Sequence, residues 1–439
     1  MHRSLSFVSL SFVSFFTCVV FAGAQATAPP APQPVQLPIT ITAAAAPGGP
    51  VPLSLAQVLE LSHRANPSLL SAAQHLAAVK AGETTAGLRQ NPTAVLGGQM
   101  LTLSPSDPNG PDFYQAGVQR LFERGNKRGL RLENARSTTL LTSEQLADQQ
   151  RQNDLAVRQA FSRMLYAQAA LGISQQNLEG YQKTVDLMKV RLNAGDIDQT
   201  DFDRVELQLV GFQSDLDNAH LTLQQGSIAL QSLLGIASPS ESFAITGTLH
   251  PSPVAYSQEE LRTLALANRP DLKAAQAQME ANTSALKLAQ ANGTADPTVE
   301  AEYERSGNAN TMGGSINIPL RLFDRNQGEK ERARYELESS RLAITAARNQ
   351  VLSDVDSAWA GYQTALVQDG RYRDKYLAEA AHVRDNLEFS YRHGNATLLD
   401  YLSALSDYRQ VNLAALNANL QLLLAVEQLA TAAHTEMAP

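Results

Sequence analysis

Acidic side chains form the clusters in this sequence that are most capable of chemistry. Four aspartates are crowded into one short stretch, namely Asp196, Asp198, Asp201 and Asp203. Calcium loops carry carboxylates at similar spacing, but they need a glycine where Asp201 stands and a glutamate at the end of the loop. Neither residue is in register here, so we expect no metal site in this stretch.

A second acidic group consists of Glu300, Glu302 and Glu304, which alternate with Val299, Ala301 and Tyr303. A period of two predicts a β-strand with carboxylates on one face and apolar side chains on the other. Carboxylates facing lipid are destabilising, and like charges on one face repel unless water or ions screen them. The pattern therefore favours a strand whose acidic face lines a water-filled lumen. The alternative is an ordinary solvated face of a soluble sheet.

Other reactive constellations are missing from the sequence. The histidines are scattered and show no metal-ligand spacing, and we find no nucleophile elbow, phosphate loop or dinucleotide fingerprint. The formal net charge of −8 argues against a nucleic-acid partner. We therefore predict a protein that is not an enzyme and binds no cofactor.

The N-terminal region has the composition of a secretion signal followed by a linker. Residues 1–26 combine Arg3, an apolar serine-rich core and a small-residue cleavage site, which predicts a signal peptide. The only cysteine, Cys18, lies in that core, and Thr17 before it makes Cys18 a poor lipidation site. Residues 27–52 are rich in alanine and proline and predict an extended linker.

The remaining chain is an internal duplication, with units at residues 53–250 and 251–434 and a short tail at 435–439. Features recur in the same order: Ser54–Leu69 resembles Ser257–Leu272, Leu121–Arg124 resembles Leu322–Arg325, and Gly195 corresponds to Gly394. In each unit a serine can cap the first helix, and Pro67 or Pro270 breaks it.

Each unit also contains two segments with strand periodicity. We predict strands at about 93–103, 113–122, 298–305 and 312–321, with a turn at 306–311 in the second unit. These lengths suit outer-membrane strands. Four strands cannot close a barrel, so the pattern predicts that oligomerisation completes it.

Long helical patterns follow the strands, from Gly125 to Asn193 and from Arg325 to His393. In the second, apolar residues recur every seven positions, which predicts a coiled-coil-like seam roughly 100 Å long. A returning helix follows each one. Arg409 and Asn412 interrupt the apolar face of the second returning helix, and the sequence offers no reason for them.

Each long helix is predicted to end in a hairpin tip, at about 193–199 and 392–397. Gly195 and Gly394 stand where a helix C-terminus needs a left-handed residue, and an aspartate–aromatic pair follows six residues later in both. These features resemble the periplasmic tips of TolC-like outer-membrane factors. The run Phe323–Gly328 resembles the outer-membrane components of cobalt–zinc–cadmium efflux systems.

The resemblance implies a mainly α fold with a small β part, in which long helical hairpins and four transmembrane strands per protomer assemble as a homotrimer. It implies adaptor-docking tips formed by Arg191, Leu192, Gly195, Tyr391, Arg392 and Gly394. It also implies an aspartate ring at the pore, with Asp400 and Asp201 as gate candidates. Ser403 replaces a second family aspartate, so this constriction would be less acidic. An aspartate that merely caps a helix start is the alternative for both gate candidates.

We therefore interpret the chain as the outer-membrane channel of a tripartite efflux system, with helices reaching into the periplasm. Its implied partners are a periplasmic adaptor protein, an inner-membrane pump and outer-membrane lipid. Metal cations are one candidate cargo. The alternative is a periplasmic coiled-coil scaffold that does not cross the membrane.

Overall fold

The computed structural model describes residues 52–99, 113–240, 243–249 and 254–436. The predicted signal peptide, Cys18 and all but the last residue of the predicted linker lie outside these ranges. So do the end of the first predicted strand and the loop after it. The described residues belong to one compact unit.

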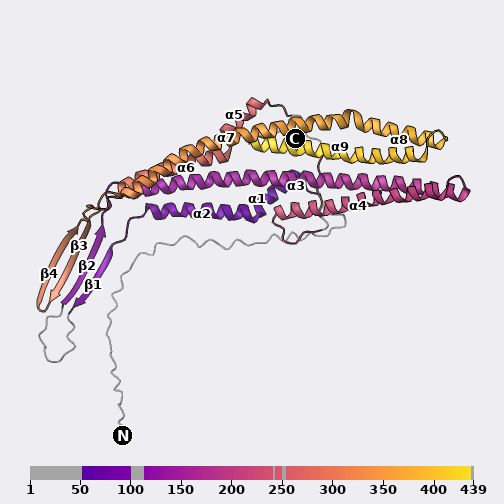
Figure 1. Cartoon of the computed structure of the whole chain (residues 1–439). Helices are drawn as coiled ribbons and strands as arrows, with labels where there is room; N and C mark the ends of the chain where they lie inside the picture. The colour runs from indigo at the N-terminus through magenta and orange to yellow at the C-terminus, as the bar shows by residue number, and fades with distance from the viewer. Residues whose placement is uncertain (1–51, 100–112, 241–242, 250–253, 437–439) are drawn as a thin grey trace, which may run out of the picture. The chain divides into compact units, whose positions relative to one another are not determined.

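The first repeat runs from two short helices through two strands into a long hairpin (Figure 1). Its elements are α1 (Leu55–Ala65), α2 (Pro67–Gly87), β1 (Thr93–Gln99), β2 (Phe113–Leu121), α3 (Lys127–Ala194) and α4 (Gln199–Leu233). Helix α3 has 68 residues, so it is roughly 100 Å long. It connects the sheet to the hairpin tip without a break.

The second repeat has the same order of elements. They are α5 (Gln258–Asn268), α6 (Pro270–Asn292), β3 (Thr298–Ser306), β4 (Ala309–Asn317), α7 (Gln327–Arg371), η1 (Tyr372–Tyr376), α8 (Leu377–Arg392) and α9 (Leu398–Ala433). The predicted uninterrupted α-helix from Arg325 to His393 is wrong in one respect. A π-helical turn, η1, separates α7 from α8, so the backbone hydrogen bonds shift register there.

The helix starts follow the sequence signals closely. Ser54 and Ser257 each form a capping box with the residue three positions later, Gln57 and Glu260. Pro67 and Pro270 occupy the first positions of α2 and α6, where a missing N–H costs nothing. Both proline breaks are therefore corners between two short helices.

The four strands form one antiparallel sheet in the order β1-β2-β3-β4. Strand β4 covers residues 309–317, so the predicted strand at 312–321 and the predicted turn at 306–311 are displaced. The cause is Gly307, whose φ of 59° allows a hairpin loop so short that Ala309 pairs with Ser306.

Three clusters of buried apolar side chains hold the helices together. One surrounds the α1 corner, one surrounds the α5 corner with α7 and α9, and one joins the two hairpins near their tips. The predicted seam of α7 lies in the second cluster, where Val351, Val355, Ala358, Tyr362 and Ala365 are buried and Trp359 packs against them. The seam is therefore a real packing surface over the middle of α7.

Among the described residues, one helix, α9, is long and apolar enough to cross a membrane, with a mean hydropathy of 1.2 over its best window. Many of its side chains belong to the second and third clusters, and Glu427 and Arg409 contact side chains of α3 and α4. We interpret α9 as a packing helix of the bundle, because its neighbours account for its hydrophobicity.

Candidate functional site

The sheet has one acidic face and one apolar face. Glu300, Glu302 and Glu304 point to the half-buried face of β3, and the residues between them are exposed on the other face. Across the sheet the acidic face continues through Gln115, Gly117 and Gln119 on one side and Thr311, Gly313 and Ser315 on the other. The alternation seen in the sequence is thus a property of the folded sheet.

Glu302 occupies the middle of this acidic face. The Gln115 side chain donates a hydrogen bond to its Oε2 at 2.5 Å, and its cross-strand neighbours are Gly117 and Gly313. A Cβ on Gly117 would lie 3.3 Å from the Cβ of Glu302 and 3.1 Å from a backbone oxygen, so the glycines make room for the carboxylate. Ser315 Oγ lies 3.3 Å from Glu300 Oε2 and donates to it.

The opposite face of the sheet carries exposed apolar side chains from all four strands. Met312 is 87% exposed and Leu96 81% exposed. The set also includes Tyr114, Val118, Val299, Tyr303 and Ile316. A contiguous exposed apolar face on a sheet marks a surface that contacts lipid or another protein.

The two hairpin tips share one backbone motif. Gly195 (φ 80°) and Gly394 (φ 76°) both adopt the left-handed conformation. The N–H of Asp196 donates to the Arg191 carbonyl, and the N–H of Asn395 donates to the Ser390 carbonyl, which is the long hydrogen bond of a Schellman motif in each case. The predicted left-handed conformation of the two glycines at the helix ends is confirmed.

The gate candidates have different surroundings. Asp400 lies in the first turn of α9, where its Oδ2 accepts hydrogen bonds from the Thr397 hydroxyl at 2.6 Å and the Thr397 N–H at 3.1 Å. These hydrogen bonds lower the pKa of Asp400, because they stabilise its ionised form. Asp201 does not cap α4, because Asp198 does, and its Oδ1 lies 3.5 Å from Arg204.

Three of the four clustered aspartates have separate side-chain partners. Asp198 accepts from the Asp201 N–H, Asp201 faces Arg204, and Asp203 accepts from the Gln199 side chain. Within the described ranges, no three His, Cys, Asp or Glu side chains come together as metal ligands would. These aspartates are close in the sequence because they lie just before α4 and within its first two turns.

Aromatic side chains join the two tips. The Tyr391 and Tyr401 rings stack with centroids 5.5 Å apart, and the Arg191 guanidinium lies 5.3 Å from the Tyr391 centroid. The Tyr391 hydroxyl also donates to Met188 Sδ on α3. Tip residues predicted from two halves of the sequence therefore meet in space, while Arg392 instead pairs with Glu388 on its own helix.

Arg409, which the sequence left unexplained, ties α9 to α4. Its Nη1 lies 3.3 Å from Asp215 Oδ2, and its guanidinium lies 5.0 Å from the Phe212 ring centroid. Gly211 provides the space, because a Cβ there would lie 2.8 Å from Nη1. An arginine within a leucine-rich face was the only signal of this cross-link in the sequence.

Asp407 is a further acidic residue that the sequence reasoning missed. It lies seven residues, or two helical turns, beyond Asp400 and is exposed on the same side of α9. It borders an open hollow of about 400 Å³ beside the π-helical turn, together with Tyr372, Tyr376 and Glu379. Its heptad spacing from Asp400 could have identified it.

The family model described as outer membrane efflux protein matches residues 58–236 and 261–433, one segment in each repeat. The chain belongs to this family. Members of the outer membrane efflux protein family are transport components of the outer membrane, and this confirms the predicted location and the resemblance to TolC-like outer-membrane factors.

Individual relatives agree with the family. The cobalt-zinc-cadmium resistance protein CzcC of Cupriavidus metallidurans is 26% identical over 328 residues, covering 72% of this chain and 77% of CzcC. The CusC crystal structure has a TM-score of 0.73 at 18% identity and covers 87% of this chain and 92% of CusC. VceC from Vibrio cholerae has a TM-score of 0.71 at 20% identity, covering 87% of this chain and 96% of VceC.

These comparisons confirm the mainly helical fold with a small antiparallel sheet. The lumen position of the acidic face, the gating role of Asp400 and Asp201 and the docking role of the tips stay predictions.

Proposed function

We propose that this protein is the outer-membrane channel of a tripartite efflux system and works as a homotrimer. The observation that carries the proposal is the two-faced sheet. It is apolar on its exposed face and acidic on the other, and among the described residues β1 and β4 each lack a partner on their outer edge. Three such sheets would pair edge to edge in a twelve-stranded barrel, with lipid outside and carboxylates inside.

The helical part supports the same assembly. Large apolar side chains are exposed along the hairpins, including Leu207, Val210, Leu342, Phe389 and Leu399. Exposed apolar surface of this extent needs a neighbour. Neighbouring protomers would cover it and continue the duct into the periplasm. The scaffold alternative accounts neither for the apolar sheet face nor for the match to an outer-membrane family.

The deciding experiment is native mass spectrometry of the protein extracted from an outer-membrane fraction. We expect a trimer that requires detergent for solubility. A monomer or dimer that washes off in high salt would overturn the proposal, because four strands alone cannot close a barrel.

We propose metal cations as the cargo. The proposal draws on the cobalt-zinc-cadmium resistance named for CzcC and on the three glutamates of the acidic face. Rings of carboxylates in a water-filled lumen favour cations. Replacing Glu300, Glu302 and Glu304 with Gln should reduce the cation preference of single channels, read as a shift of reversal potential in asymmetric salt.

The matched control for that measurement is a triple Gln variant of Glu329, Glu331 and Glu338, which makes the same charge change on α7. The acidic-lumen proposal predicts a much smaller shift for this control. Equal shifts for both triples, or none for either, would contradict it.

We propose Asp400 as the main gate residue and Asp201 as a weaker one, because Arg204 offsets part of the Asp201 charge. Asp400→Asn should raise the resting conductance in planar bilayers. Asparagine removes the charge but keeps an oxygen that can accept from Thr397. Thr397→Ala, which removes the cap and keeps the charge, should leave the conductance low. An unchanged conductance in Asp400→Asn would exclude the gating role.

We propose that the tips bearing Gly195 and Gly394 meet the periplasmic adaptor. Both end in the same rigid motif and expose polar residues such as Arg392. A photocrosslinker at position 392 should capture the adaptor in intact cells, and the same group at exposed Glu338 on α7 should not. Capture of the adaptor from both positions alike would count against docking at the tips.

A further inference from the structure

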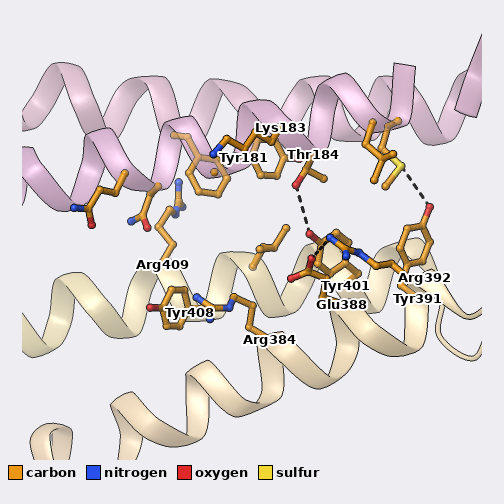
Figure 2. Close-up of a pocket in the computed structure, with 17 residues that line it drawn as sticks. Tyr181, Lys183, Thr184, Arg384, Glu388, Tyr391, Arg392, Tyr401, Tyr408 and Arg409 are labelled. Carbon is orange, nitrogen blue, oxygen red and sulfur yellow. Dashed lines mark hydrogen bonds and ion pairs between the residues drawn. The ribbon is translucent and has the colours of Figure 1, made fainter. Parts of the chain in front are cut away.

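A pocket lies between α3 of the first repeat and α8 and α9 of the second. Figure 2 shows Tyr181, Lys183 and Thr184 on one side and Arg384, Tyr401, Tyr408 and Arg409 on the other. Its volume is about 340 Å³, which is in the range of small-molecule sites. The proposed channel function gives this pocket no role.

The walls of the pocket are aromatic. Tyr181 stacks on Phe212 with ring centroids 4.3 Å apart, and Tyr401 stacks on Tyr391. The Thr184 and Tyr401 hydroxyls are 3.4 Å apart across the space between the helices. Aromatic walls held in stacked pairs provide flat apolar surfaces for a planar or aliphatic group.

The lining of the pocket carries more positive than negative side chains. Its lining includes four cations, Lys183, Arg384, Arg392 and Arg409, and one carboxylate, Glu388, which pairs with Arg392. Asp385 and Asp215 reach Arg384 and Arg409 from outside the lining. Within the described part of the chain, Lys183 makes no ion pair, so its charge is free to meet a ligand.

Two buried donors in the pocket lack acceptors. Arg409 Nε and Asn177 Nδ2 are shielded from solvent and have no hydrogen-bond partner among the described residues. Buried donors are almost always satisfied in folded proteins, so such a pair in one pocket needs an explanation. A ligand that brings two acceptor oxygens would supply it once the two side chains turn these donors into the pocket.

The geometry points to a binding site for a small organic carboxylate, with the carboxylate among Arg409, Asn177 and Lys183 and its apolar body between the tyrosine rings. A carboxylate offers two oxygens, and it matches guanidinium donors well. An inorganic anion would leave the aromatic walls unused. Such a ligand would contact both repeats at once and so stabilise the arrangement in which the two hairpins lie together. The site requires neither a trimer nor a particular cargo.

Benzoate is a suitable probe, and benzamide is its neutral counterpart. We expect isothermal titration of the full-length, detergent-extracted protein to show one benzoate per chain, with benzamide binding at least tenfold more weakly. Lys183→Gln should weaken benzoate binding about tenfold, as expected for loss of one charge-assisted contact. Lys189→Gln removes an exposed charge from the same helix outside the pocket and should bind benzoate like the wild type.

Arg409→Gln should abolish benzoate binding. Because Arg409 also holds Asp215, the Lys183 pair keeps the test valid if that variant folds poorly. Equal affinity for benzoate and benzamide, equal weakening by the two lysine variants, or no binding at millimolar benzoate would overturn the proposal. Inorganic phosphate binding as tightly as benzoate would also overturn it, because the aromatic walls would then contribute nothing.

Discussion

The two corners between short helices have the same backbone and opposite chemistry. Asn66 and Arg269 each precede the proline that opens the next helix, and both are buried. Asn66 donates to Asn153 at 2.8 Å and to the Leu233 carbonyl at 3.0 Å, so its surroundings are neutral. By contrast, Arg269 forms two ion pairs: its Nη2 lies 2.6 Å from Asp271 Oδ2, and its Nη1 lies 2.8 Å from Asp354 Oδ2.

The difference shows what a duplicated fold must keep and what it can exchange. The proline and the capping serine fix the bend in both corners, because they act within a few residues. The buried polar side chain only has to find polar partners, one of them on the adjacent long helix (Asn153 on α3 or Asp354 on α7), and amides or an ion-pair cluster both meet that need. The charged solution carries a higher penalty when one partner is lost.

The largest expected effect follows from that penalty. Arg269→Met should destabilise the protein by about 4 kcal/mol, since it leaves Asp271 and Asp354 without their shared cation. Asn66→Ala should cost only about 1–2 kcal/mol, the price of a cap and its hydrogen bonds. Thermal unfolding in detergent measures both.

Adding Asp271→Asn and Asp354→Asn to Arg269→Met should recover much of the lost stability. Equal costs at both corners would contradict the proposed difference between the charged and the neutral corner.

A second contrast concerns Glu427 on α9. When the two repeats are aligned on Gly195 and Gly394, Glu427 corresponds to Ile228 on α4, which is 46% exposed. Glu427 is 8% exposed and accepts from Ser162 Oγ at 2.5 Å. Burial raises its pKa to about 7, against smaller opposing effects of the Ser162 hydrogen bond and the charges of Arg158 and Arg163. A raised carboxyl pKa means that stability is fully present below the unfolded value and is lost as the pH rises through 7.

Glu427→Gln should therefore stabilise the protein at pH 8, by up to about 3 kcal/mol, and should have little effect at pH 4.5. The glutamine keeps an acceptor for Ser162, so the contact between α3 and α9 survives. Melting temperatures across this pH range test the expectation. Ser162→Ala serves as the control for the hydrogen bond alone, and a gain that is the same at both pH values would refute the role of ionisation.

The smallest expected effect concerns the glycines of the hairpin tips, where the two repeats are alike. Gly195→Ala and Gly394→Ala should each cost about 1–2 kcal/mol, because both positions are left-handed and both have open space for a Cβ. The cost should be local, and hydrogen exchange at the two tips measures it. A clearly larger effect at one tip would mean that the two matching motifs contribute differently to stability.

The sequence determined the features that depend on a few neighbouring residues. Gly195 and Gly394 as helix ends, Ser54 and Ser257 as caps, the proline corners and the two-faced strand of Glu300–Glu304 all follow from local sterics and hydrogen bonding. The duplication and the predicted strand at 113–122 were also close to the observed elements. Asp400 shows the limit of this reasoning, since its capping bond is certain and its proposed gating role depends on neighbouring chains.

Only the tertiary structure decided the contacts between distant segments. The reason for Arg409 on the apolar face of α9 is found in its contacts with Asp215 and Phe212 and in the space left by Gly211. The π-helical turn at 372–376 and the ion-pair cluster of Arg269 are likewise invisible in the local pattern. The physical reason is that periodicity records which face of an element is apolar, whereas the partner on that face is chosen by packing between helices far apart in the chain.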